Sequence, residues 1–145
     1  MTAPSVSDPF DLERFVAAQG DGTYERALTE LRDGRKTSHW MWFVFPQVAG
    51  LGHSEMSVRY ALSGVDEAVE YWAHPVLGPR YQECADAIDE LGDVSVEDVF
   101  GGIDAQKLHS SLTLFGAAAP GTATLDRLLR RHFGGEPDPA TTRLL

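Results

Sequence analysis

The most unusual segment of the chain carries four aromatic side chains within six residues, in the stretch SHWMWFVFPQ over residues 38–47. A helix or a strand turns one face to the core. A segment that is aromatic on every side is therefore either buried on both faces or offers one face to a ligand. A central core element and a stacking platform for a nucleotide base both fit this pattern. The candidate ligand-binding residues of this region are Lys36, Ser38, His39, Trp40, Trp42 and Gln47.

A second candidate segment reads KLHSSLT over residues 107–113. If it is helical, Lys107, Ser110 and Ser111 place a cation and two hydroxyl groups near one side of the helix. Such a face could hold a phosphate or a ribose. A solvated helix face, with the hydroxyls bonded back to the helix, fits the same residues.

Other common catalytic patterns are missing from the sequence. It contains no glycine-rich phosphate loop, no paired-histidine zinc helix and no nucleophile elbow. Its five histidines are far apart, and its single cysteine, Cys84, allows neither an internal disulfide nor a cysteine-based zinc site. We therefore predict no metal and no cofactor.

The charge of the chain restricts its partners. Among 145 residues, 22 are acidic and 12 are lysine or arginine, so the formal net charge is −10. This charge repels a phosphate backbone and argues against non-specific nucleic-acid binding, although Arg32, Arg35 and Lys36 form a local basic group. No apolar run reaches the ~18 residues of a membrane span. We predict a cytoplasmic protein without a membrane partner.

Hydrophobic spacing, capping residues and glycine or proline stops predict a mainly α-helical fold. Residues 1–7 are expected to fray, and residues 8–145 are expected to form one compact domain of about seven helices with at most one or two short strands. Asp8, Thr23, Ser38 and Ser95 are the predicted N-terminal caps. The predicted helices cover about 8–19, 23–33, 65–73, 76–91, 95–100, 105–119 and 124–133; residues 38–45 favour a short helix over a strand, and residues 47–57 a loop.

Several motifs together closely resemble the family known as domain of unknown function 1810, sometimes labelled calpastatin-like in bacterial genomes. The resemblance extends from Asp8 to Leu145. It rests on the stretches DPFDLERF (8–15), SHWMWFVFPQ (38–47), HPVLG (74–78) and LHSSLTLF (108–115). We discount the calpastatin-like label, because a protease inhibitor of that kind is expected to be extended and disordered.

That family is grouped with the YbiA-like superfamily, which includes NADAR proteins associated with ADP-ribose and N-glycosidic bond cleavage. The NADAR patterns are similar to residues 13–19 and 98–101 and to Arg35 with Trp40. This resemblance implies that Glu13, or second Asp98, stabilises positive charge on the ribose. It also implies that Trp40 stacks on the base while Lys107 or Lys36 holds phosphate.

Three functions remain open at this point. The first is an N-glycosidase acting on an ADP-ribosylated or phosphoribosylated base or a related nucleotide. The second is a non-catalytic domain that binds a nucleotide or ADP-ribose-like ligand in the same pocket. The third is a protein-interaction domain in which the aromatic segment is simply core. The glycosidase requires Glu13, Trp40 and Lys107 to converge on one hollow, and the sequence indicates neither the substrate nor the oligomeric state.

Overall fold

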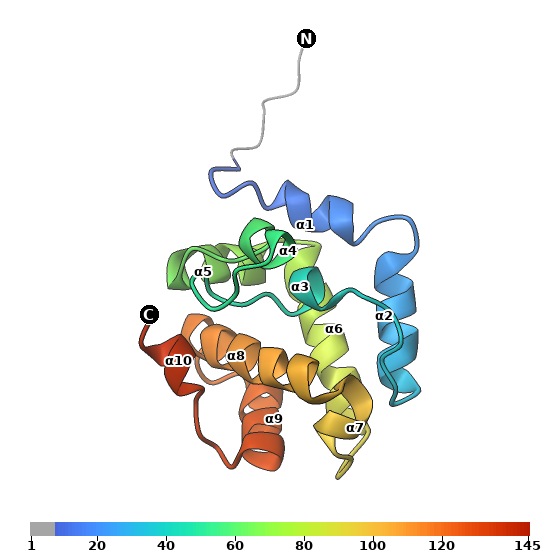
Figure 1. Ribbon diagram of the computed structural model, residues 1–145. Coiled ribbons are helices and arrows are strands. Elements are labelled where there is room, and N and C mark those ends of the chain that lie inside the picture. Colours follow the sequence, from blue (N-terminus) through green and yellow to red (C-terminus); the bar gives the residue numbers. More distant parts are fainter. Residues whose placement is uncertain (1–7) are drawn as a thin grey trace.

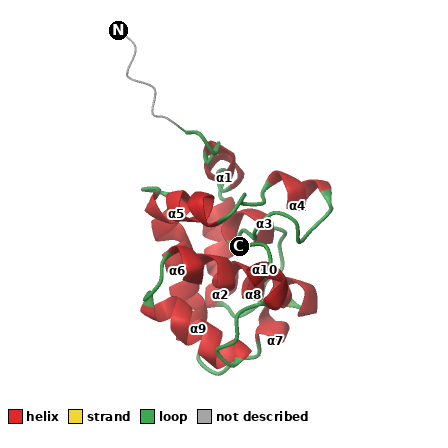
Figure 2. Cartoon of the chain, turned by 90° about the vertical axis from the view of Figure 1, so that its left-hand side faces the viewer, coloured by secondary structure: helices red, strands yellow, loops and turns green. Residues whose placement is uncertain are grey.

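Ten helices form the regular structure of residues 8–145, which are the residues that the computed structural model describes (Figures 1 and 2). The predicted mainly helical domain is confirmed, and the prediction for residues 1–7 lies outside the described residues. The helices are α1 (Glu13–Ala18), α2 (Thr23–Arg32), α3 (Met41–Val44), α4 (Glu55–Arg59), α5 (Val65–Ala73), α6 (Leu77–Glu90), α7 (Val96–Phe100), α8 (Gly102–Ala118), α9 (Ala123–Phe133) and α10 (Pro139–Thr142).

The core forms where α6 and α8, the two longest helices, meet the aromatic segment. Tyr81 of α6 and Phe115 of α8 have ring centroids 4.3 Å apart, and Phe45 lies edge-on to Tyr81 at 5.1 Å. These rings are fully or almost fully buried. Edge-to-face pairs add to the free energy gained by burying their area. The aromatic segment is therefore largely core, and its partners come from helices far away in the sequence.

Two segments near the core differ from the sequence prediction, one by a shorter helix and one by an additional helix. Residues 38–45 contain only the four-residue helix α3, and α4 occupies the end of the predicted loop at 47–57. The β-structure of the described residues is one isolated parallel bridge between Val48 and Leu62. It closes the loop on which α4 lies.

Two of the four predicted caps, Ser95 and Asp8, accept hydrogen bonds from backbone N–H groups at the start of a helix. The Ser95 hydroxyl accepts a hydrogen bond from the Asp98 N–H, and the Asp8 carboxylate accepts from the N–H groups of Leu12 and Glu13. The other two predictions are wrong. Gly22, with a left-handed backbone, precedes α2 in place of Thr23. Ser38 lies before α3, and its hydroxyl donates to the Glu30 carboxylate instead.

Helices α5 and α6 approach each other too closely for any side chain at Gly78. A Cβ atom built there would lie 1.9 Å from the carbonyl oxygen of Trp72, which is backbone and cannot rotate away. Gly116, in the interior of α8, contrasts with it, since no atom outside its own stretch of helix lies within 4 Å of a Cβ atom built there.

We predict opposite effects of alanine at these two glycines. Gly78→Ala forces α5 and α6 apart and should lower the free energy of unfolding by about 3 kcal/mol. Gly116→Ala, the matched control, should raise it by up to about 1 kcal/mol because alanine favours the helix. Urea denaturation of both variants measures the difference. Equal effects would contradict the close approach of the two helices.

Candidate functional site

The two predicted catalytic carboxylates are far apart. Glu13 lies on α1 and Asp98 is exposed on α7, and these helices occupy opposite ends of the molecule in both Figures 1 and 2. Glu13 lines a pocket between α1 and α5, whereas Lys107 lines another beside α3 and α8. Glu13 and Lys107 therefore do not share the single hollow that the glycosidase prediction requires.

Trp40 is not the predicted stacking platform, because its ring is buried in the core with only 1% of its surface exposed. Its ring lies 6.3 Å from that of Phe45 and 6.4 Å from that of Phe100. Its indole Nε1–H donates to the Glu30 carboxylate at 3.0 Å. A base therefore has no free face of Trp40 to stack on.

The partner of Trp40, Glu30, is a buried carboxylate on α2 that organises the segment before α3. Its oxygens accept from the N–H of Thr37 (2.8 Å), from the N–H (2.9 Å) and hydroxyl (2.7 Å) of Ser38, and from the Trp40 indole. Desolvation alone would raise the pKa of Glu30. The hydrogen bonds from Ser38, Thr37 and Trp40 outweigh it and lower this pKa to about 2. Ser38, a predicted ligand-binding residue, is thus an internal donor.

Ser110 and Ser111 are also structural, because their α8 face is buried and does not line the pocket beside Lys107. The Ser110 hydroxyl bonds to the Gln106 carbonyl and the Asp138 carboxylate, each at 3.1 Å. Ser111 and Tyr81 share a hydrogen bond of 2.9 Å between their hydroxyls. The prediction that these serines hold substrate is wrong, since their hydroxyls are used to pack α10 and α6 against α8.

Gln47 lies apart from the lysines as well. It lines a small hollow with Val48, Gly52 and Ser57, and Trp42 borders that hollow too. The Gln47 carbonyl accepts from the Leu62 N–H at 2.9 Å beside the β-bridge. Trp42 Nε1 is buried without a hydrogen-bond partner in the described part of the chain.

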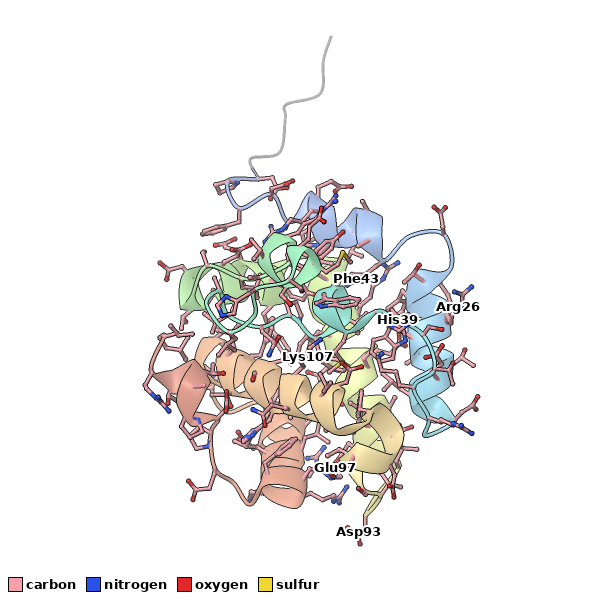
Figure 3. The ribbon with its side chains drawn as sticks, in the orientation of Figure 1. Arg26, His39, Phe43, Asp93, Glu97 and Lys107 are labelled. Atoms are coloured by element: carbon pink, nitrogen blue, oxygen red, sulfur yellow. The ribbon has the colours of Figure 1, made fainter. Side chains whose placement is uncertain are left out.

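The remaining predicted ligand-binding residues do come together. Lys36, His39, Trp42 and Lys107 border one open cavity of about 380 Å³, which we call the α3–α8 pocket. Figure 3 shows Lys107 on α8 and His39 on the loop that leads into α3. The other lining residues are Met41, Phe100, Gly101, Gly102, Ile103 and Asp104.

The charges of the α3–α8 pocket centre on Asp104. Its carboxylate lies 2.8 Å from Lys36 Nζ and 3.6 Å from Lys107 Nζ. The Lys36 ammonium also donates to the Ser38 carbonyl and lies 5.1 Å from the centre of the Trp40 ring, while Lys107 Nζ lies 5.0 Å from that of Trp42. Two lysines against one aspartate leave the pocket positive.

The backbone of α8 adds to this positive potential. The helix starts at Gly102 after Gly101 and has no side-chain cap at its N-terminus. The Ala105 N–H bonds to the Gly101 carbonyl, so the N–H groups of Gly102 and Ile103 precede the helical ladder. Such groups, together with the helix dipole, favour an anion.

Sequence reasoning missed two residues that shape the pocket. Asp104 could have been found, because it lies one helical turn before Lys107, at the spacing of an ion pair. Glu30 carries no sequence signal. In the sequence it looks like any acidic residue of a helix, and its role becomes visible only in the fold, where residues 37–40 surround its carboxylate.

Comparison with known proteins adds a family but no activity. A family model described as "Protein of unknown function (DUF1810)" matches residues 9–145. The crystal structure of the conserved hypothetical protein Rv1873 from Mycobacterium tuberculosis is 47% identical, with a TM-score of 0.92, and the match covers 95% of this chain and 98% of that one. No curated protein matches the chain. Neither finding supports the YbiA-like or NADAR relationship or the calpastatin-like label.

None of the helices in residues 8–145 combines the length and the apolar character needed to span a bilayer. No three His, Cys, Asp or Glu side chains among the same residues are grouped so as to hold a metal ion.

We predict that Glu30 stabilises the fold through the hydrogen bonds that its ionised carboxylate accepts. Glu30→Ala leaves buried donors without an acceptor and should lower the free energy of unfolding by at least about 3 kcal/mol at pH 7. Glu30→Gln keeps one acceptor oxygen but loses the negative charge that these bonds favour, and it should lower the free energy of unfolding by about 2 kcal/mol. Urea denaturation measures both, and equal losses would contradict this role.

The low pKa of Glu30 also predicts a pH dependence. A carboxyl whose pKa is lower in the folded state stabilises the fold above its unfolded pKa and loses this contribution as the pH falls through its folded pKa. The advantage of the wild type over Glu30→Gln should therefore shrink from about pH 4.5 to about pH 2. Urea denaturation at several pH values gives this difference, and a constant difference would refute it.

Proposed function

The chain belongs to the DUF1810 family, and from the geometry of the α3–α8 pocket we propose that it binds a small anionic ligand of the nucleotide or ADP-ribose class. The observation that carries the proposal is the meeting of Lys36 and Lys107 at the uncapped N-terminus of α8. The Lys107 ammonium and the N-terminal N–H groups of α8 suit a phosphate group, and the Lys36 ammonium, whose side chain is 6% exposed, adds positive charge beside Asp104. The pocket volume of about 380 Å³ lies in the range of small-molecule sites.

Trp42 gives the pocket an aromatic wall beside its charges. Unlike Trp40, Trp42 is only partly buried. Its ring borders the pocket, and one face of the ring is turned to the Lys107 ammonium. An aromatic ring next to lysines suits a ligand that joins a flat base to a phosphate, because stacking on a ring contributes ~1–3 kcal/mol per base. Exposed His39 lies at the same wall and offers a further polar contact.

Asp104 sets the strength of this site. Its carboxylate faces both lysines, so an incoming phosphate competes with it and is repelled by it. A ligand that binds must share or displace the aspartate. This arrangement favours binding of moderate strength that is sensitive to salt.

Binding without hydrolysis is the function that this geometry favours. The glycosidase prediction placed Glu13 beneath the ribose, but Glu13 lines the pocket at α1. The carboxylate in the α3–α8 pocket is that of Asp104, and each of its oxygens faces a lysine ammonium. N-glycosidic cleavage remains a separate prediction, to be judged by its product.

The binding proposal predicts opposite effects of two substitutions at the pocket. Lys107→Gln should weaken the binding of ADP and ADP-ribose about fivefold through the loss of one charge-assisted contact. Asp104→Asn should tighten it several-fold, because the competing carboxylate is removed. Titration calorimetry measures the Kd values. Arg26→Gln, which removes an exposed arginine of α2, is the control and should leave them unchanged.

Two results would contradict the proposal: no ligand in this series binds, or Lys107→Gln binds as tightly as the wild type. Incubation with NAD, ADP-ribose and ribosylated guanosine, followed by chromatography, tests hydrolysis separately. Stabilisation without product supports a binding domain. Product formation that Glu13→Gln abolishes would instead establish the glycosidase.

A further inference from the structure

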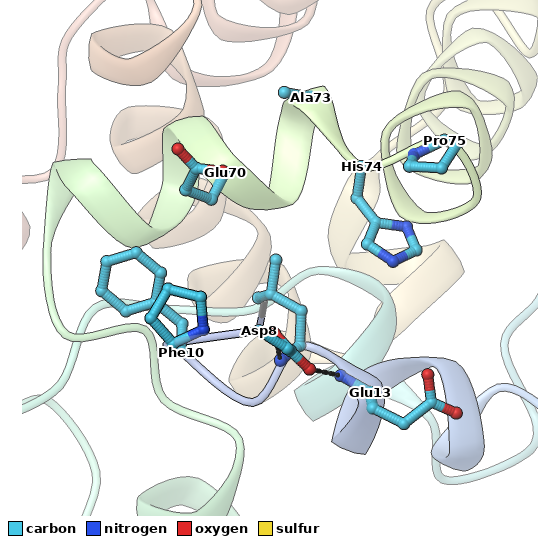
Figure 4. Close-up of a pocket in the computed structure, with 9 residues that line it drawn as sticks. Asp8, Phe10, Glu13, Glu70, Ala73, His74 and Pro75 are labelled. Carbon is cyan, nitrogen blue, oxygen red and sulfur yellow. Dashed lines mark hydrogen bonds between the residues drawn. The ribbon is translucent and has the colours of Figure 1, made fainter. Parts of the chain in front are cut away.

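A second and larger pocket lies between the start of α1 and the end of α5 (Figure 4). It has a volume of about 650 Å³, and we call it the α1–α5 pocket. Its apolar surface comes from Pro9, Phe10, Leu12, Ala73 and Pro75, and its polar groups come from Asp8, Glu13, Glu70 and His74. It is independent of the α3–α8 pocket, with which it shares no lining residue.

The nearest arginine in sequence forms no salt bridge with these acids within residues 8–145. Arg14 donates to the carbonyl groups of Arg59 (2.9 Å), Phe10 (2.6 Å) and Ala61 (2.9 Å), and it forms a salt bridge of 3.0 Å with Glu67. Through these contacts the Arg14 side chain joins α1 to α5 and to the segment that precedes α5. Of the described residues that line the pocket, three are acidic and none is lysine or arginine.

The carboxylates of the pocket differ in how they are used. Asp8 accepts from the N–H groups of Leu12 (2.7 Å) and Glu13 (3.0 Å), and these bonds lower its pKa, so it stays ionised. The carboxylates of Glu13 and Glu70 have no hydrogen-bond or salt-bridge partner within residues 8–145. Two unpaired negative groups thus border an apolar hollow.

His74 is held in one orientation at the edge of the pocket. Its Nδ1 accepts from the N–H groups of Val76 (3.1 Å) and Leu77 (3.2 Å) at the start of α6. In the neutral ring the hydrogen then sits on Nε2, since Nδ1 is already an acceptor. His74 therefore caps a helix and forms a wall of fixed orientation.

We infer that the α1–α5 pocket binds a small organic cation, a primary amine joined to an apolar body. The apolar body lies against Phe10, Leu12 and Pro75, where burial of its surface drives binding. The ammonium group pairs with Glu13 or with Glu70, the two acids that lack a partner within residues 8–145 and that lie on opposite sides of the pocket in Figure 4. The ring of Phe10 adds a surface that attracts a cation. Charge complementarity therefore determines the ligand class, and the volume suits a small molecule.

The test compares three probes of the same shape: 4-phenylbutylamine, the neutral 4-phenylbutanol and the anionic 4-phenylbutyrate. Nitrogen–proton correlation spectra of the full chain, titrated with each probe, give both Kd and location. The amine should bind at least about fivefold more tightly than the alcohol, the acid should bind most weakly, and the largest shifts should fall within residues 9–13 and 70–75.

A matched pair of variants separates the pocket from the net charge of the chain. Glu13→Gln/Glu70→Gln should weaken amine binding about fivefold and leave alcohol binding unchanged. Glu25→Gln/Glu55→Gln removes two exposed acids of α2 and α4 and should leave both unchanged. All the substituted side chains are exposed, so both variants should fold as the wild type does.

Any of three outcomes would overturn the inference. The amine and the alcohol could bind equally, the control variant could lose as much amine affinity as the pocket variant, or the shifts could lie outside the pocket. Phe10→Ala gives an additional check, because it should weaken the amine and the alcohol alike. Unchanged binding of both probes to Phe10→Ala would count against the pocket.

Discussion

The candidate site depends on one buried carboxylate, that of Glu30. Burial of an ion is unfavourable unless donors surround it, and here Thr37, Ser38 and Trp40 supply them. The segment after α2 therefore folds back so that residues 37–40 surround the Glu30 carboxylate. Trp40 is turned into the core, and Trp42, two residues on, borders the pocket. The Lys36 N–H, donating to the Val99 carbonyl at 2.8 Å, holds the same path against α7. Without these contacts the lysine and the second tryptophan would have no defined place beside α8.

The two pockets have local charges of opposite sign. The chain is strongly acidic, and a distant anion meets net repulsion, but charges beyond a Debye length of ~8 Å are largely screened at physiological salt. Inside the α3–α8 pocket the lysine groups and the helix terminus act over a few ångströms, so the local sign decides. In the α1–α5 pocket the unpaired carboxylates agree with the overall charge. The local and global fields oppose each other in the first pocket and reinforce each other in the second.

The fold was accessible from the sequence because helical spacing depends on neighbours along the chain. The apolar positions of α5, α6 and α9 recur every three or four residues, and this pattern alone predicts them. The roles of polar residues depend instead on partners that only the fold supplies. Gln19, a polar residue whose type does not indicate burial, is buried and donates to the Phe43 carbonyl at 2.8 Å. Ser111 and Tyr81 are thirty positions apart in sequence and share a hydrogen bond. Four of the predicted ligand-binding residues met in one pocket because the aromatic segment and Lys107 lie on elements that pack together.

The separation of acids from lysines bears on any chemistry at the α3–α8 pocket. Cleavage of an N-glycosidic bond needs a carboxylate close to the anomeric carbon while other groups hold the phosphate. Glu13 lies in another pocket, and the Asp104 oxygens face Lys36 and Lys107. A carboxylate whose two oxygens are both held by ammonium groups is poorly placed to stabilise a ribosyl cation, because its field is already compensated. The same arrangement serves reversible binding well, since the aspartate keeps the lysines together until a phosphate replaces it.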